Sequence, residues 1–406
     1  MTRFPQGFLW GASTSAHQTE GGNVTSDWWY LEHKPDTFCQ EPSGDAVDSY
    51  HRWGEDMDLM AEAGLTDYRF SIEWARIEPI EGAFSLAALH HYRRMIEGAL
   101  RRGLRPMITL HHFSNPLWFS ARGSWNAPGA VDRFTRYVRN VLGILHGVGH
   151  VCTINEPNMV AAFRAIAERG PEALNDGIPE PDPDCAEALI EAHHQARRIL
   201  NEACPDLQVG WSVAVQDFQV ETDAEQEAAE YVRRRQTVFL EAARGDDWIG
   251  VQTYTRARLG AEAGQVVRRS PDASAERTLT GWEYYPAALG GAVRQAASAV
   301  GTVPVIVTEN GVATGDDTRR IRYTHAALTA LLEAMDDGID VRGYFHWSLL
   351  DNYEWGSWEP TFGLVAVDRT TFVRSPKASL AWLGSVARSG RLPQAVDAAT
   401  GAGEGS

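Results

Sequence analysis

Short apolar runs typical of buried strands alternate along the whole chain with longer segments that carry apolar residues at helical spacing. Eight such runs occur, and the segments between them are long enough to hold a helix each. The strand-like runs span residues 8–12, 65–72, 104–110, 150–154, 208–213, 248–251, 303–307 and 341–345. The helical patterns include residues 86–102, 130–145, 186–203 and 324–337. Eight strand–helix units predict an α/β fold consisting of one (β/α)8 barrel, the TIM barrel.

The length of the chain predicts its domain organisation. A barrel of this kind needs about 250 residues, whereas the chain has 406. Because no linker interrupts the pattern, we expect one domain over residues 1–389, with the surplus in long loops at the carboxyl ends of the strands. Residues 390–406 are rich in glycine and alanine and are expected to form a disordered tail.

Two of the predicted strands lead into a glutamate. Glu156 follows the fourth run, before Pro157, and Glu309 follows the seventh, before Asn310-Gly311. Proline suits the first turn of a helix and Asn-Gly is a turn dipeptide, so both glutamates are expected at the mouth of the barrel. A single carboxylate at a strand end is most often a solvated loop residue or a helix cap. Two carboxylates at one barrel mouth are the minimal equipment for cleaving a glycosidic bond.

Other polar and aromatic side chains are expected at the same end of the barrel. They end or follow five further strand-like runs and comprise Gln18, Glu20, Arg69, His112, residues 252–254 and Trp347. Polar groups are therefore expected to converge on one mouth of the barrel.

The charge balance limits the kinds of partner. The chain carries 37 basic and 54 acidic side chains, a formal net charge of -17. This balance argues against nucleic acid, an anionic membrane surface or a polyanionic substrate, so a neutral ligand is expected. No uncharged apolar run is long enough to span a bilayer and residues 1–12 do not resemble a signal peptide, so a cytoplasmic location is expected.

Neither a metal site nor a cofactor is expected from the cysteines and histidines. The four cysteines lack the close spacing of metal ligands and are too few for a disulfide scaffold, which predicts reduced thiols at Cys39, Cys152, Cys185 and Cys204. Adjacent histidines such as His111-His112 direct their side chains to different sides of a strand, which disfavours a shared metal ion.

Several ordered motifs resemble those of glycoside hydrolase family one, the retaining β-glycosidases whose best-known members are β-glucosidases. The motifs are Phe8-Leu9-Trp10-Gly11-Ala12-Ser13, residues 68–76, Asn155-Glu156-Pro157, Thr308-Glu309-Asn310-Gly311, residues 281–286, residues 347–355 and Pro376-Lys377-Ala378-Ser379. The resemblance runs nearly end to end. It implies a (β/α)8 catalytic domain that needs no cofactor and acts on a small-molecule β-glycoside or oligosaccharide.

The resemblance also implies the roles of individual residues. Glu309 would be the nucleophile and Glu156 the acid/base. Arg69 and Tyr254 would hold Glu309 charged and oriented, and the nearby negative charge would raise the proton affinity of Glu156. The positions that match the family's sugar contacts are Gln18, His112, Asn155 and Glu354, with Trp347 as a stacking floor and Trp355 beside it. Phospho-glycosidase relatives place a small hydroxyl residue at the position of Glu354 and a lysine nearby, so an unphosphorylated sugar is expected.

Four features depart from the family pattern. The usual Asn-Tyr-Tyr after the sixth strand is Gln252-Thr253-Tyr254, and Phe113 replaces the usual tryptophan. The common Ala-Pro-Gly loop is missing between residues 159 and 175, and the segment 355–362 is shorter than usual. We expect Gln252 to contact the sugar through its longer amide, and recognition on the side of the 2- and 3-hydroxyl groups to be loose.

The predicted function is hydrolysis of a terminal, non-reducing β-D-glucosyl or related β-glycosyl residue with retention, through a covalent glycosyl-enzyme. Two alternatives stand beside it: a transglycosidase that passes the sugar to an alcohol acceptor, and a carbohydrate-binding barrel without activity. Product analysis separates the first and turnover of a chromogenic β-glucoside the second. The natural aglycone, the choice among glucose, galactose, fucose and xylose, and the oligomeric state are left open.

Overall fold

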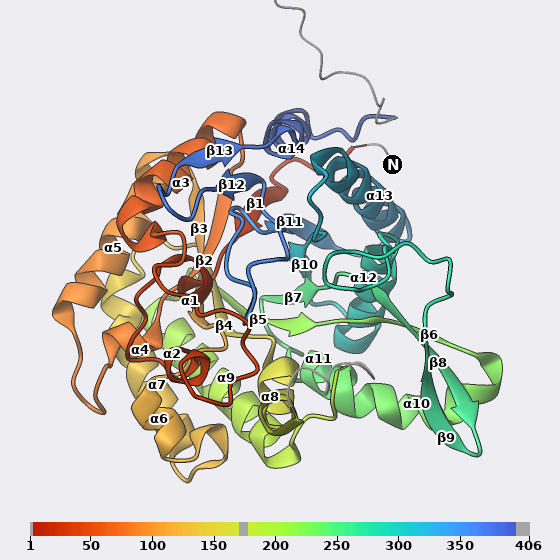
Figure 1. Ribbon diagram of the computed structural model, residues 1–406, viewed down its shortest axis with the longest axis horizontal. Helices are drawn as coiled ribbons and strands as arrows, with labels where there is room; N and C mark the ends of the chain where they lie inside the picture. The colour runs from red at the N-terminus through yellow and green to blue at the C-terminus, as the bar shows by residue number, and fades with distance from the viewer. Residues whose placement is uncertain (1–2, 170–177, 395–406) are drawn as a thin grey trace, which may run out of the picture.

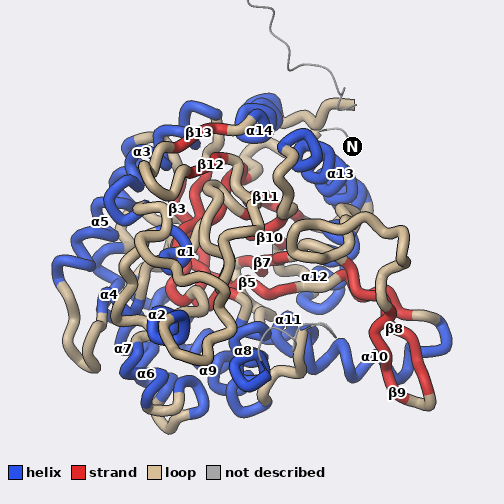
Figure 2. Tube along the Cα trace, in the orientation of Figure 1, coloured by secondary structure: helices blue, strands red, loops and turns tan. Residues whose placement is uncertain are grey.

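Eight parallel strands close into a barrel in the computed structural model, which describes residues 3–169 and 178–394. Around the barrel the strands follow the order β1-β11-β10-β7-β5-β4-β3-β2. Their bounds are β1 (Leu9–Ser13), β2 (Asp67–Ser71), β3 (Arg105–His111), β4 (His150–Asn155), β5 (Gln208–Ala214), β7 (Trp248–Gln252), β10 (Val305–Asn310) and β11 (Val341–Trp347). The strands gather at the centre of a ring of helices (Figures 1 and 2), and the predicted (β/α)8 barrel is confirmed.

Each barrel strand is followed by at least one helix before the next strand begins. The helices between successive strands, and the one after the last strand, include α3 (Ser49–Ala63), α5 (Leu86–Arg101), α7 (Ala130–Val141), α9 (Pro183–Ala203), α11 (Val238–Ala242), α12 (Ala288–Val300), α13 (Asp317–Asp336) and α14 (Ala378–Ser389). Further helices lie in the connections: α1 (Ala16–Thr19), α2 (Asp27–Glu32), α4 (Trp74–Ile77), α6 (Leu117–Ala121), α8 (Pro157–Arg169) and α10 (Glu225–Val232).

The predicted strands agree with the observed ones, with differences at the ends that have local causes. The seventh strand continues beyond the predicted run and includes Glu309, because a register shift between Val307 and Glu309 lets the strand keep pairing with β7. Helix α9 begins earlier than its apolar pattern, since the Asp182 side chain accepts a hydrogen bond from the backbone N–H of Cys185 and Pro183 fits the first turn.

The barrel interior is filled with side chains. A cluster of six buried residues draws one member from each of six barrel strands: Leu9, Met107, Cys152, Trp248, Ile306 and Phe345. A much larger apolar cluster includes residues of the strands and of the surrounding helices. The barrel is therefore a packed core rather than a pore, and polar groups at the carboxyl ends of the strands rest on a rigid support.

The surplus length of the chain lies mainly in connections that leave the carboxyl ends of strands. The connections after β5 and β7 build a three-stranded sheet from β6 (Asp217–Val220), β8 (Arg256–Glu262) and β9 (Gln265–Arg269). This sheet projects from the edge of the molecule (Figure 1). After β11, a long loop leads to the short pair β12 (Val365–Val367) and β13 (Arg374–Pro376).

The first residues of the predicted tail contact the rest of the domain. The backbone of Arg391 forms an isolated bridge with Arg3, Leu392 is buried, and the Pro393 carbonyl accepts a hydrogen bond from His325 Nε2 at 2.7 Å. Residues 395–406 lie outside the described residues, as do residues 170–177, which include the last part of the segment where the family's Ala-Pro-Gly loop is missing. The limits of the domain stay a prediction.

Within the described residues, no helix is both long and apolar enough to cross a bilayer. The same part of the chain holds no group of three or more histidine, cysteine, aspartate or glutamate side chains placed to bind a metal ion.

Candidate active site

Glu156 and Glu309 line one cavity of about 360 Å³. Glu156 follows β4 immediately before α8, with a φ of 46°, and its backbone N–H donates to the Ser212 carbonyl of β5 at 2.7 Å. Glu309 lies near the end of β10 and is 4% exposed. The two carboxylates that the sequence placed at the barrel mouth therefore meet at one site, which we call the first cavity.

Three side chains donate hydrogen bonds to Glu309. Arg69, which is fully buried on β2, donates from Nη1 to Oε1 at 2.6 Å. Gln252 Nε2 donates to the same oxygen at 2.9 Å, and the Tyr254 hydroxyl donates to Oε2 at 2.6 Å. The Asn310 side chain donates to the Thr253 carbonyl at 2.7 Å, which ties the end of β7 to β10. Glu309 is thus held rigidly by an arginine charge and neutral donors.

The surroundings separate the pKa values of the two glutamates. Burial and the charge of Glu309 hold the pKa of Glu156 well above its ordinary value, against an opposing effect of Arg69. Burial also raises the pKa of Glu309, but the charge of Arg69 and the hydrogen bonds from Tyr254 and Arg69 oppose this effect. Glu309 is therefore the group that ionises first, and Glu156 is the group that retains a proton.

Asn155 connects this cluster to His112. Arg69 Nη2 and Gln252 Nε2 both donate to Asn155 Oδ1, the latter at 2.8 Å. The side-chain nitrogen of Asn155 therefore faces away from Arg69 and Gln252. That nitrogen lies 3.2 Å from His112 Nε2 and must be the donor, which leaves the imidazole neutral with its proton on Nδ1. Burial and the charge of Arg69 hold the pKa of His112 well below its ordinary value, in agreement with a neutral ring.

Gln18 and Trp347 position the carboxyl group of Glu354. Gln18 Nε2 donates to Asn352 Oδ1 at 3.0 Å and to Glu354 Oε2 at 3.3 Å, and Trp347 Nε1 donates to Glu354 Oε1 at 3.2 Å. The Glu354 carboxyl group lies deep in the site, and loss of solvation raises its pKa to about 8 despite these hydrogen bonds. The sequence did not indicate this raised pKa, which depends on burial in the folded structure.

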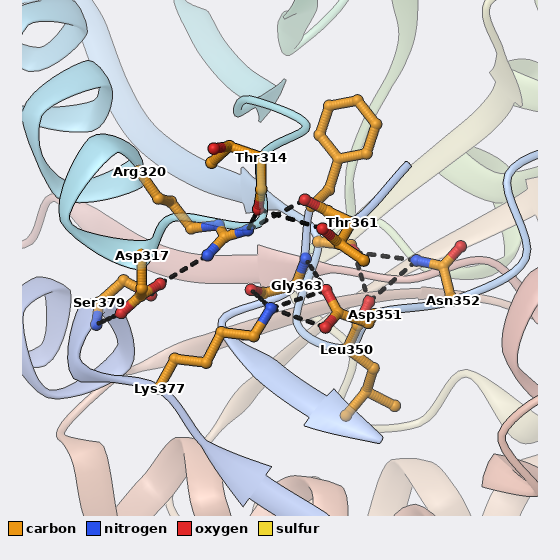
Figure 3. Close-up of polar contacts among 12 residues, drawn as sticks. Thr314, Asp317, Arg320, Leu350, Asp351, Asn352, Thr361, Gly363, Lys377 and Ser379 are labelled. Atoms are coloured by element: carbon orange, nitrogen blue, oxygen red, sulfur yellow. Dashed lines mark hydrogen bonds and ion pairs between the residues drawn. The ribbon is translucent and has the colours of Figure 1, made fainter. Parts of the chain in front are cut away.

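Charged side chains hold the loop after β11 in place, as Figure 3 shows. Lys377 Nζ contacts the two carboxylate oxygens of Asp351 at 2.8 and 2.7 Å and donates to the Gly363 carbonyl at 2.9 Å. The Arg320 guanidinium donates to the Thr361 carbonyl at 2.9 Å. Both ends of the loop are therefore fixed, which restricts the residues between them to one position over the barrel mouth.

The structure brings most of the predicted site residues to the first cavity. Its lining includes Glu156, Glu309, Tyr254, His112, Trp347, Glu354 and Trp355. Arg69, Asn155 and Gln18 lie behind this lining and hydrogen-bond to it. Gln252 lines a neighbouring cavity, and its amide nitrogen is occupied by Asn155 and Glu309. Glu20, at the end of α1 after β1, is not among the residues lining either cavity and pairs with Arg76 at 2.7 Å.

Two members of an aromatic wall in the first cavity, Trp28 and Phe163, were missed from the sequence. Trp355 lies 4.7 Å from Trp28 and 5.0 Å from Phe113 between ring centroids, and its ring stacks on His17 at 5.7 Å. Phe163 closes this wall, 5.3 Å from Phe113. The α2 and α8 residues carry no local signal of a binding role, because their apolar side chains resemble ordinary core positions.

Comparisons with known proteins agree with this geometry. The model of glycosyl hydrolase family 1 matches residues 1–246 and 244–391. The chain belongs to glycosyl hydrolase family 1. It is therefore a hydrolase of a retaining family, and the predicted resemblance is confirmed.

Relatives in this family align over nearly their full lengths. The thermostable β-glucosidase B of Thermobispora bispora is 32% identical, over 95% of this chain and 90% of the relative. The β-glucosidase A of Thermotoga maritima is 27% identical, over 96% of this chain and 99% of the relative. Among solved structures, the β-glycosidase from Pyrococcus horikoshii has a TM-score of 0.87 at 32% identity, covering 97% of this chain and 96% of that one.

Proposed function

We propose that this family 1 enzyme hydrolyses terminal, non-reducing β-D-glucosyl or related β-glycosyl residues, with Glu309 as nucleophile and Glu156 as acid/base. The observation that carries the assignment is the unequal surroundings of two carboxyl groups at one cavity. Arg69, Tyr254 and Gln252 donate to Glu309, whereas burial and the charge of Glu309 together hold the pKa of Glu156 well above its ordinary value. The β-glucosidases among the relatives support the choice of sugar.

The reaction proceeds in two displacements. The ionised Glu309 attacks the anomeric carbon while Glu156 gives its proton to the leaving oxygen, so the glycosidic bond breaks and a covalent glycosyl-enzyme forms. Glu156, now ionised, then takes a proton from water as the water oxygen attacks the anomeric carbon and releases Glu309. Two inversions give net retention, and both carboxyl groups return to their starting states.

The sugar would lie among the polar and aromatic groups of the first cavity. Asn155, His112, Gln18 and Glu354 present amide, imidazole and carboxyl groups to hydroxyls, and the indoles of Trp347 and Trp355 offer flat apolar faces. Gln252 remains a proposed sugar contact, although substrate must compete with Glu309 and Asn155 for its amide nitrogen.

We expect more than one β-glycoside to be cleaved. The Gln252 amide nitrogen already donates to Glu309 and Asn155, and Phe113 provides no donor, so neither residue offers a free donor to a particular hydroxyl. A panel of aryl β-glycosides differing only in the sugar should show the glucoside and at least one epimer or deoxy analogue within about 100-fold in kcat/KM. Gln252→Asn should sharpen this selectivity. Selectivity on the order of 10⁴ against every analogue would contradict the expectation.

Glu354 should favour unphosphorylated sugars. Glu354→Ser removes a group that hydrogen-bonds through both oxygens, so it should lower kcat/KM for an aryl β-glucoside more than for its 6-phosphate. Because its pKa is raised to about 8, Glu354 becomes charged only as the pH rises through that value, and discrimination against the phosphate should increase there. Glu359→Ser, at an exposed position on the same loop, is the control. A wild-type preference for the phosphorylated substrate would refute the proposal.

The same family membership and site disfavour a carbohydrate-binding barrel without activity. Transfer to an alcohol acceptor differs from hydrolysis only in the second displacement, and product analysis distinguishes them. The four cysteines are free thiols, the state expected in a reducing compartment, and we infer a cytoplasmic enzyme of carbohydrate metabolism from this and from the acidic charge balance.

A further inference from the structure

A second cavity of about 710 Å³ adjoins the first one. The residues that line both cavities include Glu156, Tyr254 and Trp282, whereas Glu309 lines the first cavity and not the second among the residues described. An acid that protonates the leaving oxygen must lie on the side of the leaving group, and the nucleophile lies on the side of the sugar. The part of the second cavity away from Gln252 and Tyr254, which hydrogen-bond to Glu309, is therefore the place of the leaving group.

Arginine side chains dominate the charge of the second cavity. Four arginines line it (Arg256, Arg268, Arg269 and Arg277), beside two carboxyl groups, Glu156 and Glu283. Since Glu156 holds its proton before the first displacement, the fixed charge of this lining is positive although the chain carries a net charge of -17. Clefts lined by one sign of charge attract ligands of the opposite sign.

The arginines of the second cavity differ in whether a carboxylate already forms an ion pair with them. Arg256 forms hydrogen bonds to both carboxylate oxygens of Glu283, at 3.0 and 2.7 Å. Arg269 pairs with Glu221 and Glu262. Arg277 is different: no carboxylate forms an ion pair with it within residues 3–169 and 178–394, and its Nη1 donates to the Gly281 carbonyl at 3.0 Å.

A short hairpin-like loop carries both Arg277 and Trp282, and both residues line the second cavity. The backbone of Arg277 bridges to Glu283, and the Thr278 N–H donates to the Trp282 carbonyl at 2.9 Å. Trp282 is 42% exposed and its ring lies 5.6 Å from that of Tyr254, whose hydroxyl holds Glu309. The loop thus presents to the second cavity a flat apolar ring near Tyr254 and a cation that has no carboxylate partner among the described residues.

We propose that the leaving group accepted by this enzyme is a flat apolar group that carries an anionic substituent, such as a carboxylate, which Arg277 binds while Trp282 packs against the ring. This inference rests on the proposed function, because it assigns the leaving-group half of the same site. The net negative charge of the chain does not oppose this binding. An anion in contact with Arg277 is affected little by charges more than about 10 Å away, because salt at ordinary concentration screens them.

Two glucosides that differ in one charge test the proposal. The aglycones are 4-(carboxymethyl)phenol and 4-(carbamoylmethyl)phenol, whose methylene group isolates the phenol oxygen from the substituent and keeps the two leaving abilities similar. The wild-type enzyme should prefer the carboxylate by about two- to fivefold in kcat/KM at low salt, as befits a partly exposed ion pair, and the preference should shrink as salt is added.

Two variants test whether Arg277 causes the preference for the carboxylate-bearing glucoside. Arg277→Gln should bring the ratio of the two kcat/KM values to about 1 or below. The control is Arg258→Gln, which removes an arginine charge on strand β8 that does not line the second cavity. This variant should keep the wild-type ratio of the two kcat/KM values. Equal rates for both glucosides in the wild type, or an unchanged ratio in Arg277→Gln, would overturn this inference and leave the proposed function intact. Failure to cleave either glucoside would overturn the proposed function itself.

Discussion

Replacing Glu309 with alanine should lower kcat for every β-glycoside by a factor on the order of 10⁵, because no other group can form the covalent bond to the anomeric carbon. The variant leaves a gap where Gln252 and Arg69 now donate to Glu309, but it keeps the proposed sugar contacts. The binding of substrate should therefore suffer far less than turnover. Steady-state kinetics with an aryl β-glucoside measures the loss. Glu309→Gln, which keeps the volume and the hydrogen-bond acceptor, should be equally inactive, and this separates lost chemistry from lost structure.

The stereochemistry of the wild-type reaction tests the same assignment independently. Proton NMR of the first-formed sugar should show the β-anomer before mutarotation mixes the two forms, since two displacements restore the starting configuration. Appearance of the α-anomer first would mean that water attacks directly, and Glu309 would then not be the nucleophile.

Replacing Glu156 with alanine should produce a loss that depends on the leaving group. Substrates whose leaving oxygen needs a proton should lose about 10²- to 10⁴-fold in kcat/KM, whereas aryl glycosides with acidic phenols should be largely spared in the first displacement. The second displacement also lacks its base, so the glycosyl-enzyme should accumulate. Added azide needs no base, and it should attack the anomeric carbon, displace Glu309 and give the β-glycosyl azide.

The pH dependence gives a second measurement on this variant. The pKa of Glu156 is raised well above its ordinary value, so the wild type should lose activity as the pH rises through that pKa and the proton leaves. In Glu156→Ala this alkaline limb of kcat/KM should disappear, while the acidic limb, set by protonation of Glu309, should persist. An unchanged alkaline limb, or failure to trap an azide product, would contradict the assignment of Glu156.

The order of strands and helices and the identity of the reacting pair could be predicted from the sequence. The apolar runs of the barrel strands and the helical spacing between them are local patterns, and alternation of this kind leads to one architecture. Once the barrel is inferred, its geometry places the carboxyl ends of all strands at one mouth, which is why Glu156 and Glu309 could be paired across more than 150 residues.

Side-chain partners could not be predicted in this way, because they depend on which loops fold back over the mouth. Nothing local shows that Gln252 donates to Glu309 and Asn155, or that burial raises the pKa of Glu354 to about 8. The loop that carries Arg277 and Trp282 follows β9, far from Glu156 along the chain, and only the folded structure places its residues in the cavity that Glu156 also lines.

The sequence by itself therefore determined the barrel, the family resemblance and the two carboxyl groups, whereas the tertiary structure alone decided the electrostatics and the leaving-group side of the site. The physical reason is the range of the interactions involved. Strand and helix patterns reflect solvent exposure within a few neighbouring residues, while a pKa or an unmatched charge at Arg277 depends on burial and on contacts between residues distant in the chain.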